Sequence, residues 1–306
     1  MRAAVIDLGS NSVRLLIKDI SDGLLATVHR ELATTRLGRG VVKNSELDRQ
    51  SVADTLSVVE DFIIKAKSMG AERIFAFGTS ALREAKNSGE FIKKLNELGL
   101  DVDILPGEKE ALLSFIGARA GLGLSETALV MDIGGGSTEL ILGKEQILKS
   151  VSLPLGAVRF TELYFKSEPP NFDDVTKAGE KIRELCFEFA SYFKEIQAEN
   201  RVVAVGVGGT LTTLAAMDQK LEIYDADKVH GYVLKKASID NIYSKLLKLT
   251  TDEKRKLPGL MPQRADIIAA GTFIARSIME NLDIDEITVS ETDLMEGYLL
   301  DRWKTS

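Results

Sequence analysis

Two segments of the chain have nearly the same sequence, VIDLGSNSVRLLI at residues 5–17 and VMDIGGGSTELIL at residues 130–142. Each segment has an apolar run, an aspartate, a turn of small residues and a second apolar run, which is the pattern of a β-hairpin with a polar tip. A hairpin that occurs twice in one chain indicates a duplicated domain. Aligned without a gap, the segments share Val5 and Val130, Asp7 and Asp132, Gly9 and Gly134, Ser12 and Ser137, and Leu15 and Leu140.

The segments that follow the two hairpins support this duplication. After each hairpin a third strand is predicted, and amphipathic helices and short strands then alternate. The longest helix of the first half is predicted to have Ser45 as its N-cap. At 306 residues the chain is longer than most single hydrophobic cores, and GLGLS at residues 121–125 is the best boundary. We therefore predict an α/β protein with two domains, residues 1–121 and residues 122–292.

Composition and charge exclude several classes of protein. Hydrophobic residues make up 44% of the chain, as in ordinary globular proteins, and no apolar run approaches the ~20 residues of a membrane span. The net charge of −7 argues against a general nucleic-acid surface, although an acidic protein can still bind a small anion. The only cysteine, Cys186, excludes an internal disulfide, and two histidines are too few for a zinc site. We expect a cytoplasmic protein without a membrane segment.

Glycine-rich turns offer a site for phosphate. The tips of the two hairpins, residues 9–12 and 134–137, expose successive backbone N–H groups, and glycine lets the backbone approach an anion closely. A third turn at residues 206–210 lies between a predicted strand and a predicted helix, so it adds N–H groups at a helix N-terminus. Asp7 and Asp132 precede the two tips, where their carboxylates can meet a divalent cation or its waters. These features together predict a phosphate site that uses a metal ion.

The two hairpins differ at one charged position. Arg14 occupies the place in the first hairpin that Glu139 has in the second, so the sign of the charge is exchanged at the equivalent site. The two hairpins therefore have different tasks, and we expect the second one to hold the metal.

Seven motifs in sequence order resemble those of the exopolyphosphatase / guanosine-pentaphosphate phosphatase (Ppx/GppA) family. They are VIDLGSNSVRLLI, TSALREAKN, PGEKEA, VMDIGGGSTEL, VGVGGTLTTLA, VHGY and RADIIAAG, and they span almost the whole chain. The resemblance implies the short, two-domain form of the family, with duplicated actin-like (ribonuclease H-like) domains whose mixed β-sheets are flanked by helices. It also implies that a final helix, residues 293–306, packs back on the first domain. The implied activity is release of terminal phosphate from inorganic polyphosphate, or conversion of pppGpp to ppGpp.

The resemblance also assigns roles to single residues. The catalytic glutamate of the family, which activates the attacking water, corresponds to Glu110, although Lys109 departs from the family pattern just before it. Asp132 and Glu139 correspond to acids that act with Mg²⁺, and Asp7 is a third metal candidate. Mg²⁺ prefers carboxylate and phosphate oxygens. The predicted phosphate-binding residues are Gly9, Ser10, Asn11, Ser12, Arg83, Gly134, Gly135, Gly136, Ser137, Thr138, Gly208, Gly209 and Thr210.

Two other functions remain open. The chain can be an ATP-dependent sugar or acid kinase of the actin/hexokinase/Hsp70 superfamily, which the two hairpins also resemble, or a non-catalytic sensor that binds a phosphorylated nucleotide such as ppGpp. The GEKEA segment followed by DIGGGSTEL favours the hydrolase over the kinase. The sequence does not choose between polyphosphate and pppGpp as the anionic ligand, and it leaves open whether the chain forms a homodimer.

Overall fold

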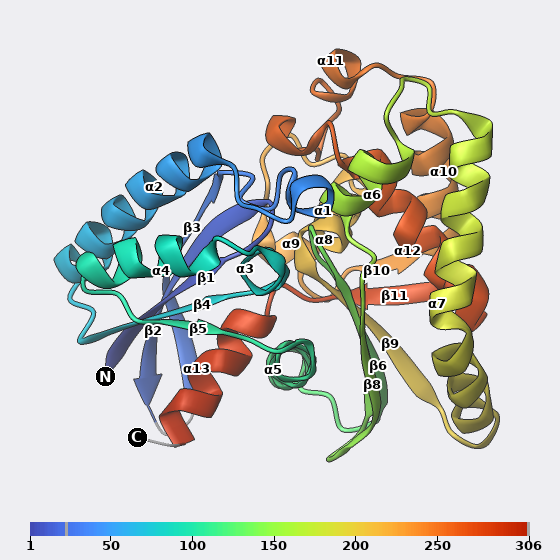
Figure 1. The fold of residues 1–306 in the computed structure, drawn as a ribbon. Coiled ribbons are helices and arrows are strands. Elements are labelled where there is room, and N and C mark those ends of the chain that lie inside the picture. The colour runs from blue at the N-terminus through green and yellow to red at the C-terminus, as the bar shows by residue number, and fades with distance from the viewer. Residues whose placement is uncertain (22–23, 305–306) are drawn as a thin grey trace.

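The computed structural model describes residues 1–21 and 24–304 and has two α/β halves, each built on one β-sheet (Figure 1). In the first half the strands are β1 (Arg2–Leu8), β2 (Ser12–Ser21), β3 (Leu24–Thr34), β4 (Arg73–Gly78) and β5 (Val102–Ile104). Its helices are α1 (Val41–Asn44), α2 (Arg49–Ser68), α3 (Ser80–Glu84), α4 (Ser88–Glu97) and α5 (Gly107–Leu122).

The second half begins at the second hairpin and contains more helices. Its strands are β6 (Thr127–Ile133), β7 (Thr138–Gly143), β8 (Ile147–Leu153), β9 (Val202–Val207), β10 (Val233–Lys235) and β11 (Glu286–Val289). Its α-helices are α6 (Ala157–Tyr164), α7 (Phe172–Glu199), α8 (Gly208–Asp218), α9 (Ala226–Val229), α10 (Lys236–Leu246), α11 (Thr251–Lys254), α12 (Ile268–Leu282) and α13 (Leu294–Lys304). A short 3₁₀ helix, η1, spans Pro262–Arg264.

The two sheets repeat one strand order. The first sheet has the order β3-β2-β1-β4-β5, and the second has the order β10-β11-β9-β6-β7-β8. In the first sheet β1 pairs antiparallel with β2 and parallel with β4. In the second sheet β6 pairs in the same way, antiparallel with β7 and parallel with β9. The second sheet adds β10 as an antiparallel edge strand. The predicted pair of mixed sheets is therefore confirmed, and the repeat in sequence is a repeat in topology.

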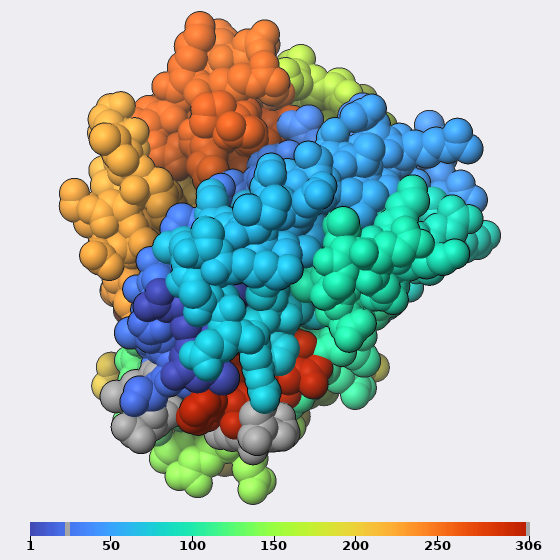
Figure 2. Space-filling view, turned by 90° about the vertical axis from the view of Figure 1, so that its left-hand side faces the viewer, coloured from blue at the N-terminus to red at the C-terminus, as the bar shows by residue number. Residues whose placement is uncertain are grey.

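Helices cover both faces of each sheet because its strands are apolar on both faces. On the outer side, α2 and α4 pack on the first sheet, and α7, α8, α10 and α12 pack on the second. Figure 2 shows α2 (light blue) and α4 (teal) side by side on the outer face of the first half. Within the described part of the chain, no helix combines the length and hydropathy of a membrane span.

Helices α5 and α13 lie between the two sheets (Figure 1). Apolar residues of α13, including Leu294 and Tyr298, pack on the inner face of the first sheet, and residues of α5 such as Phe115 pack on the second. The two helices cross at glycines, since a Cβ added at Gly297 would lie 1.9 Å from the carbonyl oxygen of Leu113. The chain order places α5 in the first half, but its packing joins it to both sheets.

One expectation from the sequence needs correction. Ser45 is not the N-cap of the long helix, because it has a positive φ of 55° and ends α1. Asp48 caps α2 instead, and its carboxylate accepts a hydrogen bond from the backbone N–H of Ser51. The sequence pattern between residues 219 and 264 does not reveal the elements α9, β10, α10, α11 and η1 that form there. Four of these five elements have only three or four residues, too few for a periodic pattern to stand out. The last two residues of the predicted final helix, 305–306, lie outside the described residues.

Candidate active site

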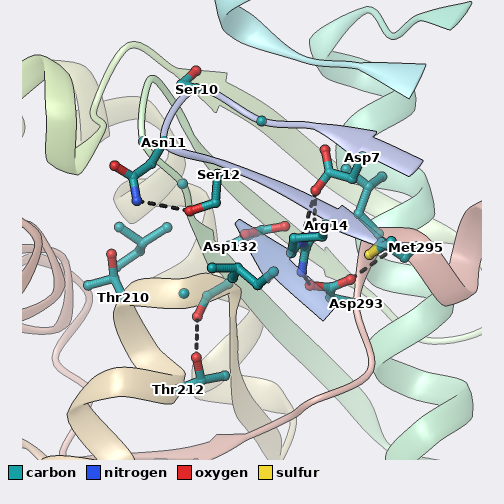
Figure 3. A pocket seen from close by; sticks show the side chains of 18 of the residues that line it. Asp7, Ser10, Asn11, Ser12, Arg14, Asp132, Thr210, Thr212, Asp293 and Met295 are labelled. Atoms are coloured by element: carbon teal, nitrogen blue, oxygen red, sulfur yellow. Dashed lines mark hydrogen bonds and ion pairs between the residues drawn. The ribbon is translucent and has the colours of Figure 1, made fainter. Parts of the chain in front are cut away.

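The tips of both hairpins line one cavity of about 460 Å³, which Figure 3 shows from close by. Most of the site residues predicted from the sequence line this cavity. They are Asp7, Gly9, Ser10, Asn11, Ser12, Glu110, Asp132, Gly134, Gly135, Gly136, Ser137, Gly208, Gly209 and Thr210. Three predicted residues, Arg83, Thr138 and Glu139, are not part of the lining.

The two tips have the same turn and touch each other. Gly9 donates a backbone hydrogen bond to the carbonyl of Ser12, and Gly134 donates the equivalent bond to the carbonyl of Ser137. A Cβ added at Gly135 would lie 3.1 Å from the Cβ of Ser10, so glycine allows this contact. The backbone groups of both tips are therefore gathered at one end of the cavity.

Opposite charges balance in the first hairpin but not in the second. Asp7 and Arg14 are directly opposite each other on β1 and β2, and their side chains form an ion pair of 2.7 Å. The equivalent pair on β6 and β7 is Asp132 and Glu139, which are both acids. Burial raises the pKa of Asp132 to about 6, and burial and the neighbouring carboxylates raise the pKa of Glu139 well above its ordinary value. In the first hairpin the negative charge of the aspartate is thus neutralised by an arginine, whereas in the second hairpin two acids lie opposite each other and neither neutralises the other.

Glu110 lies in the first turn of α5 with its carboxyl group at the cavity and is only 6% exposed. Burial raises its pKa to about 7, although Arg83 opposes this shift. Nη1 of Arg83 donates to Oε2 of Glu110 at 3.1 Å and to the carbonyl oxygen of Leu105 at 2.7 Å. Arg83 therefore holds Glu110 and the end of β5, and does not line the cavity as a phosphate clamp would.

Thr138 is also placed differently from the prediction. It is completely buried, and its hydroxyl group donates to the carbonyl oxygen of Leu155. Its side chain thus fastens the start of β7 and is turned away from the cavity.

Arg264 is a cavity residue that the sequence reasoning did not select. A Cβ added at Gly209 would lie 2.2 Å from its guanidinium nitrogens, so this side chain lies directly on the third glycine-rich turn. Burial and the nearby Arg14 lower its pKa to about 10, and among the described residues it has no ion-pair partner. An unpaired arginine at a glycine-rich turn is suited to an anion. Its signal was present in the sequence, because it is the first residue of RADIIAAG.

Asp293 is a second residue that was missed. Its carboxylate forms an ion pair with Arg14, which thereby joins two acids that are 286 positions apart, Asp7 and Asp293. Figure 3 shows Arg14 between these two carboxylates, on the first-sheet side of the cavity. No local pattern marks Asp293, because its partner comes from the other end of the chain.

The acid pair on the second hairpin fits a magnesium ion that takes its remaining ligands from water and substrate. Among residues 1–21 and 24–304, no three His, Cys, Asp or Glu side chains are grouped closely enough to hold a metal by themselves. Mg²⁺, however, is usually bound by one or two carboxylates and takes its other ligands from water and substrate phosphates. Asp132 and Glu139 provide two uncompensated carboxylates beside the phosphate-type turns, and Oδ1 of Asp7 is buried without a hydrogen-bond partner. The chemistry of these residues therefore fits Mg²⁺.

Comparisons with known proteins agree with this geometry. The model of the Ppx/GppA phosphatase family matches residues 16–306. Exopolyphosphatase 2 of Mycobacterium tuberculosis is 34% identical over 314 residues, which cover 98% of this chain and 98% of that protein.

Solved structures of similar proteins have the same architecture. The crystal structure of an Aquifex aeolicus Ppx/GppA family member is 32% identical, with a TM-score of 0.79 and coverage of 100% of this chain and 98% of that one. That of an exopolyphosphatase from Cytophaga hutchinsonii is 26% identical, with a TM-score of 0.88 and coverage of 99% and 98%. These similarities confirm the resemblance seen in the motifs and the predicted duplicated actin-like fold.

Proposed function

The chain belongs to the Ppx/GppA phosphatase family, and we propose that it releases terminal phosphate from inorganic polyphosphate or converts pppGpp to ppGpp. One observation carries this proposal: the carboxyl group of Glu110 lines the same cavity as the glycine tips of both hairpins and the N-terminus of α8. A phosphorus atom held by the tips would thus have a candidate base within the same cavity.

Backbone N–H groups bind the terminal phosphate in this proposal. The two tips contribute turns rich in glycine and serine, and Gly208–Thr210 contribute the first turn of α8, whose dipole favours an anion. Arg264, which lies on Gly209 without an ion-pair partner among the described residues, adds a full positive charge. This positive charge would also stabilise the negative charge that develops on the phosphoryl oxygens during transfer.

Glu110 is the proposed general base. Water attacks the terminal phosphorus, Glu110 accepts the proton of that water, and the bond from phosphorus to the bridging oxygen breaks. The rest of the chain or nucleotide leaves as a phosphate anion. A pKa of about 7 suits this task, because a base works best when its pKa lies near the working pH. Arg83 is a positioning residue that fixes the direction of the Glu110 carboxyl group.

Asp132 and Glu139 would hold Mg²⁺, with Asp7 as a further candidate. When bound, the ion supplies charge neutralisation to the phosphoryl group. The protein contributes two buried carboxylates, whose mutual repulsion a divalent cation would relieve.

The charged residues of the cavity wall favour a short anion over a long polymer. Here Arg30 is paired with Glu291 and Glu296, and Arg14 is paired with Asp293. Because acids neutralise these arginines, the cavity offers no continuous basic track for a polyanion. We therefore propose pppGpp or short polyphosphate as the preferred substrate class.

The proposal is tested by product analysis with four substrates. Purified protein is incubated with Mg²⁺ and long polyphosphate, short polyphosphate, pppGpp or ATP, and each product is identified. We expect phosphate release from short polyphosphate or pppGpp, with an acid limb in kcat/KM near pH 7 as Glu110 loses its proton. ADP formation that depends on an added sugar or acid would indicate the kinase instead.

A Glu110→Gln variant separates the base from the binding site. Glutamine keeps the shape and can still accept the Arg83 hydrogen bond, but it cannot take a proton. We expect turnover to fall by roughly 10²–10⁴-fold, the usual contribution of a positioned base, while binding of pppGpp is retained. Equal turnover in the wild type and in Glu110→Gln would show that another group is the base. Binding of pppGpp without turnover in the wild type would indicate a sensor.

A further inference from the structure

A row of three polar residues crosses the second sheet beneath α5. Asp132 on β6 is directly opposite Glu139 on β7, and Glu139 is directly opposite Ser152 on β8. On α5, Ser114 follows Glu110 by four residues, so the two lie on the same face of the helix. The helix thus presents the proposed base and a hydroxyl group to the same row of side chains.

Each acid of this row accepts a serine hydroxyl from outside the hairpin tips, and Glu139 has a further hydrogen bond with the side chain of Ser137. Oγ of Ser114 donates to Oδ2 of Asp132 at 2.7 Å, and Oγ of Ser152 donates to Oε1 of Glu139 at 2.7 Å. Ser114 and Asp132 are both buried, and Glu139 is almost completely buried. Since water has little access to these groups, the serine hydroxyls determine how the carboxylates are turned.

Two glycines make this arrangement sterically possible. A Cβ added at Gly107, the first residue of α5, would lie 2.6 Å from Cβ and 2.8 Å from Oγ of Ser152. A Cβ added at Gly208 would lie 2.5 Å from Oδ1 of Asp132. Oδ1 of Asp132 therefore faces the third glycine-rich turn, while Oδ2 accepts the hydrogen bond from Ser114.

The two facing carboxylates would otherwise repel each other. Negative charges directly opposite on neighbouring strands are destabilising, and burial increases their interaction. A hydroxyl donor on each carboxylate opposes this repulsion, and Ser114 leaves Oδ1 of Asp132 for a cation. Partners of this kind usually orient metal-binding carboxylates and tune their affinity.

We propose that Ser114 and Ser152 are positioning residues that hold the Asp132–Glu139 pair in the orientation that binds the divalent cation. The proposal rests on the proposed function for the role of that cation, but its test measures cation binding directly. It also assigns a second role to α5, since one helix fixes both Glu110 and the orientation of Asp132.

Cation binding is measured with Mn²⁺ as a paramagnetic probe, titrated into the protein with inorganic phosphate present and followed by electron paramagnetic resonance. We expect Ser114→Ala and Ser152→Ala each to weaken Mn²⁺ binding by roughly 10–100-fold. The Mg²⁺ concentration for half-maximal phosphate release should rise by a similar factor. Ser114→Thr retains the hydroxyl group and should restore most of the affinity.

Gly107→Ala provides an independent arm of the test. The added methyl group should push Ser152 away from Glu139, so this variant should reproduce the effect of Ser152→Ala without removing a hydroxyl group. Ser277→Ala is the matched control, because it removes a buried serine hydroxyl from α12, outside the cavity lining. Its Mn²⁺ affinity should equal that of the wild type.

The outcomes separate this inference from the proposed function. If the wild type releases no phosphate from any substrate, the proposed function is wrong, whatever the Mn²⁺ titration gives. If the wild type is active and both alanine variants bind Mn²⁺ with wild-type affinity, the serines are not positioning residues. A loss of thermal stability without a change in Mn²⁺ affinity would likewise assign them a packing role only.

Discussion

At the scale of single residues, the site concentrates negative charge that the fold does not fully compensate. Glu110, Asp132 and Glu139 are all buried and all have raised pKa values, and burial is the largest cause in each case. Such a cluster lowers stability at neutral pH and is typical of functional sites. Asp7, whose partner Arg14 is an arginine, shows how the first hairpin avoids the same arrangement.

The charge of Glu110 should therefore be visible as a pH-dependent loss of stability. Its pKa is about 7 in the folded chain and 4.5 in the unfolded chain, so stability is lost as the pH rises from about 4.5 to about 7, and the loss is complete above that range. The difference corresponds to about 3 kcal/mol when the group is fully ionised. In EDTA at pH 8, Glu110→Gln should raise the melting temperature, whereas at pH 5 it should have little effect because the wild-type group is already neutral. A stabilisation of equal size at both pH values would contradict this explanation.

At the scale of elements, the crossing of α5 and α13 is the contact that the fold can least easily change. Backbone touches backbone here, since a Cβ at Gly117 would lie 1.9 Å from the carbonyl oxygen of Asp293. The same crossing places Asp293, just before α13, beside Arg14. Helix packing at this point thus connects the inner faces of both sheets to the charged wall of the cavity.

Gly297→Ala should destabilise the protein even though alanine is the better helix former. The added Cβ would lie 1.9 Å from the carbonyl oxygen of Leu113 and must move the helices apart. Overpacking of this kind typically costs 1–3 kcal/mol, which exceeds the gain of up to ~1 kcal/mol in helix propensity. Urea denaturation measures the difference.

Gly89→Ala in α4 is the control for this prediction. A Cβ at Gly89 would meet no atom within 4 Å, so only the propensity gain applies and stability should rise by up to ~1 kcal/mol. Equal effects of the two substitutions would show that the helix crossing is not close-packed.

At the scale of the whole molecule, the cavity has walls from both halves and is bridged at several points. Arg159 on α6 donates to Glu84 on α3 at 2.6 Å, and its Nε donates to the carbonyl oxygen of Gly136 at 2.8 Å. The backbone N–H of Gly40 donates to Glu162 at 2.8 Å. Arg36 and Asp266 form a further ion pair of 3.0 Å. Each of these contacts contributes little energy, so the packing of α5 against α13 and the bound ligand should be the main links between the halves.

A phosphate ligand should therefore stabilise the two halves together. At about 100 times its dissociation constant, pyrophosphate should add about 2.7 kcal/mol to the free energy of unfolding. Differential scanning calorimetry with Mg²⁺ should show one transition that moves to higher temperature as a unit. Two transitions, of which only one moves with ligand, would mean that the ligand contacts a single half.

The sequence by itself determined the hairpins, their polar tips and the equivalence of Asp7 with Asp132 and of Arg14 with Glu139. These features follow from alternation with a period of two and from glycine in turns, which act over a few residues. The register confirms the equivalence, since Asp7 is opposite Arg14 and Asp132 is opposite Glu139. Each tip is a local structure in the same way, but only the packing of the two halves brings both tips and the third turn to one cavity.

Only the tertiary structure decided which partners these residues have. Arg83 pairs with Glu110, Arg264 lies on Gly209, and Asp293 reaches Arg14, and each contact joins segments that are far apart in the chain or come from different elements. Packing of apolar helix faces and glycine contacts sets these distances, and no periodicity along the chain records them. The placement of α5 between two sheets is the clearest case, because it depends on the close approach of α13, which lies near the C-terminal end of the chain.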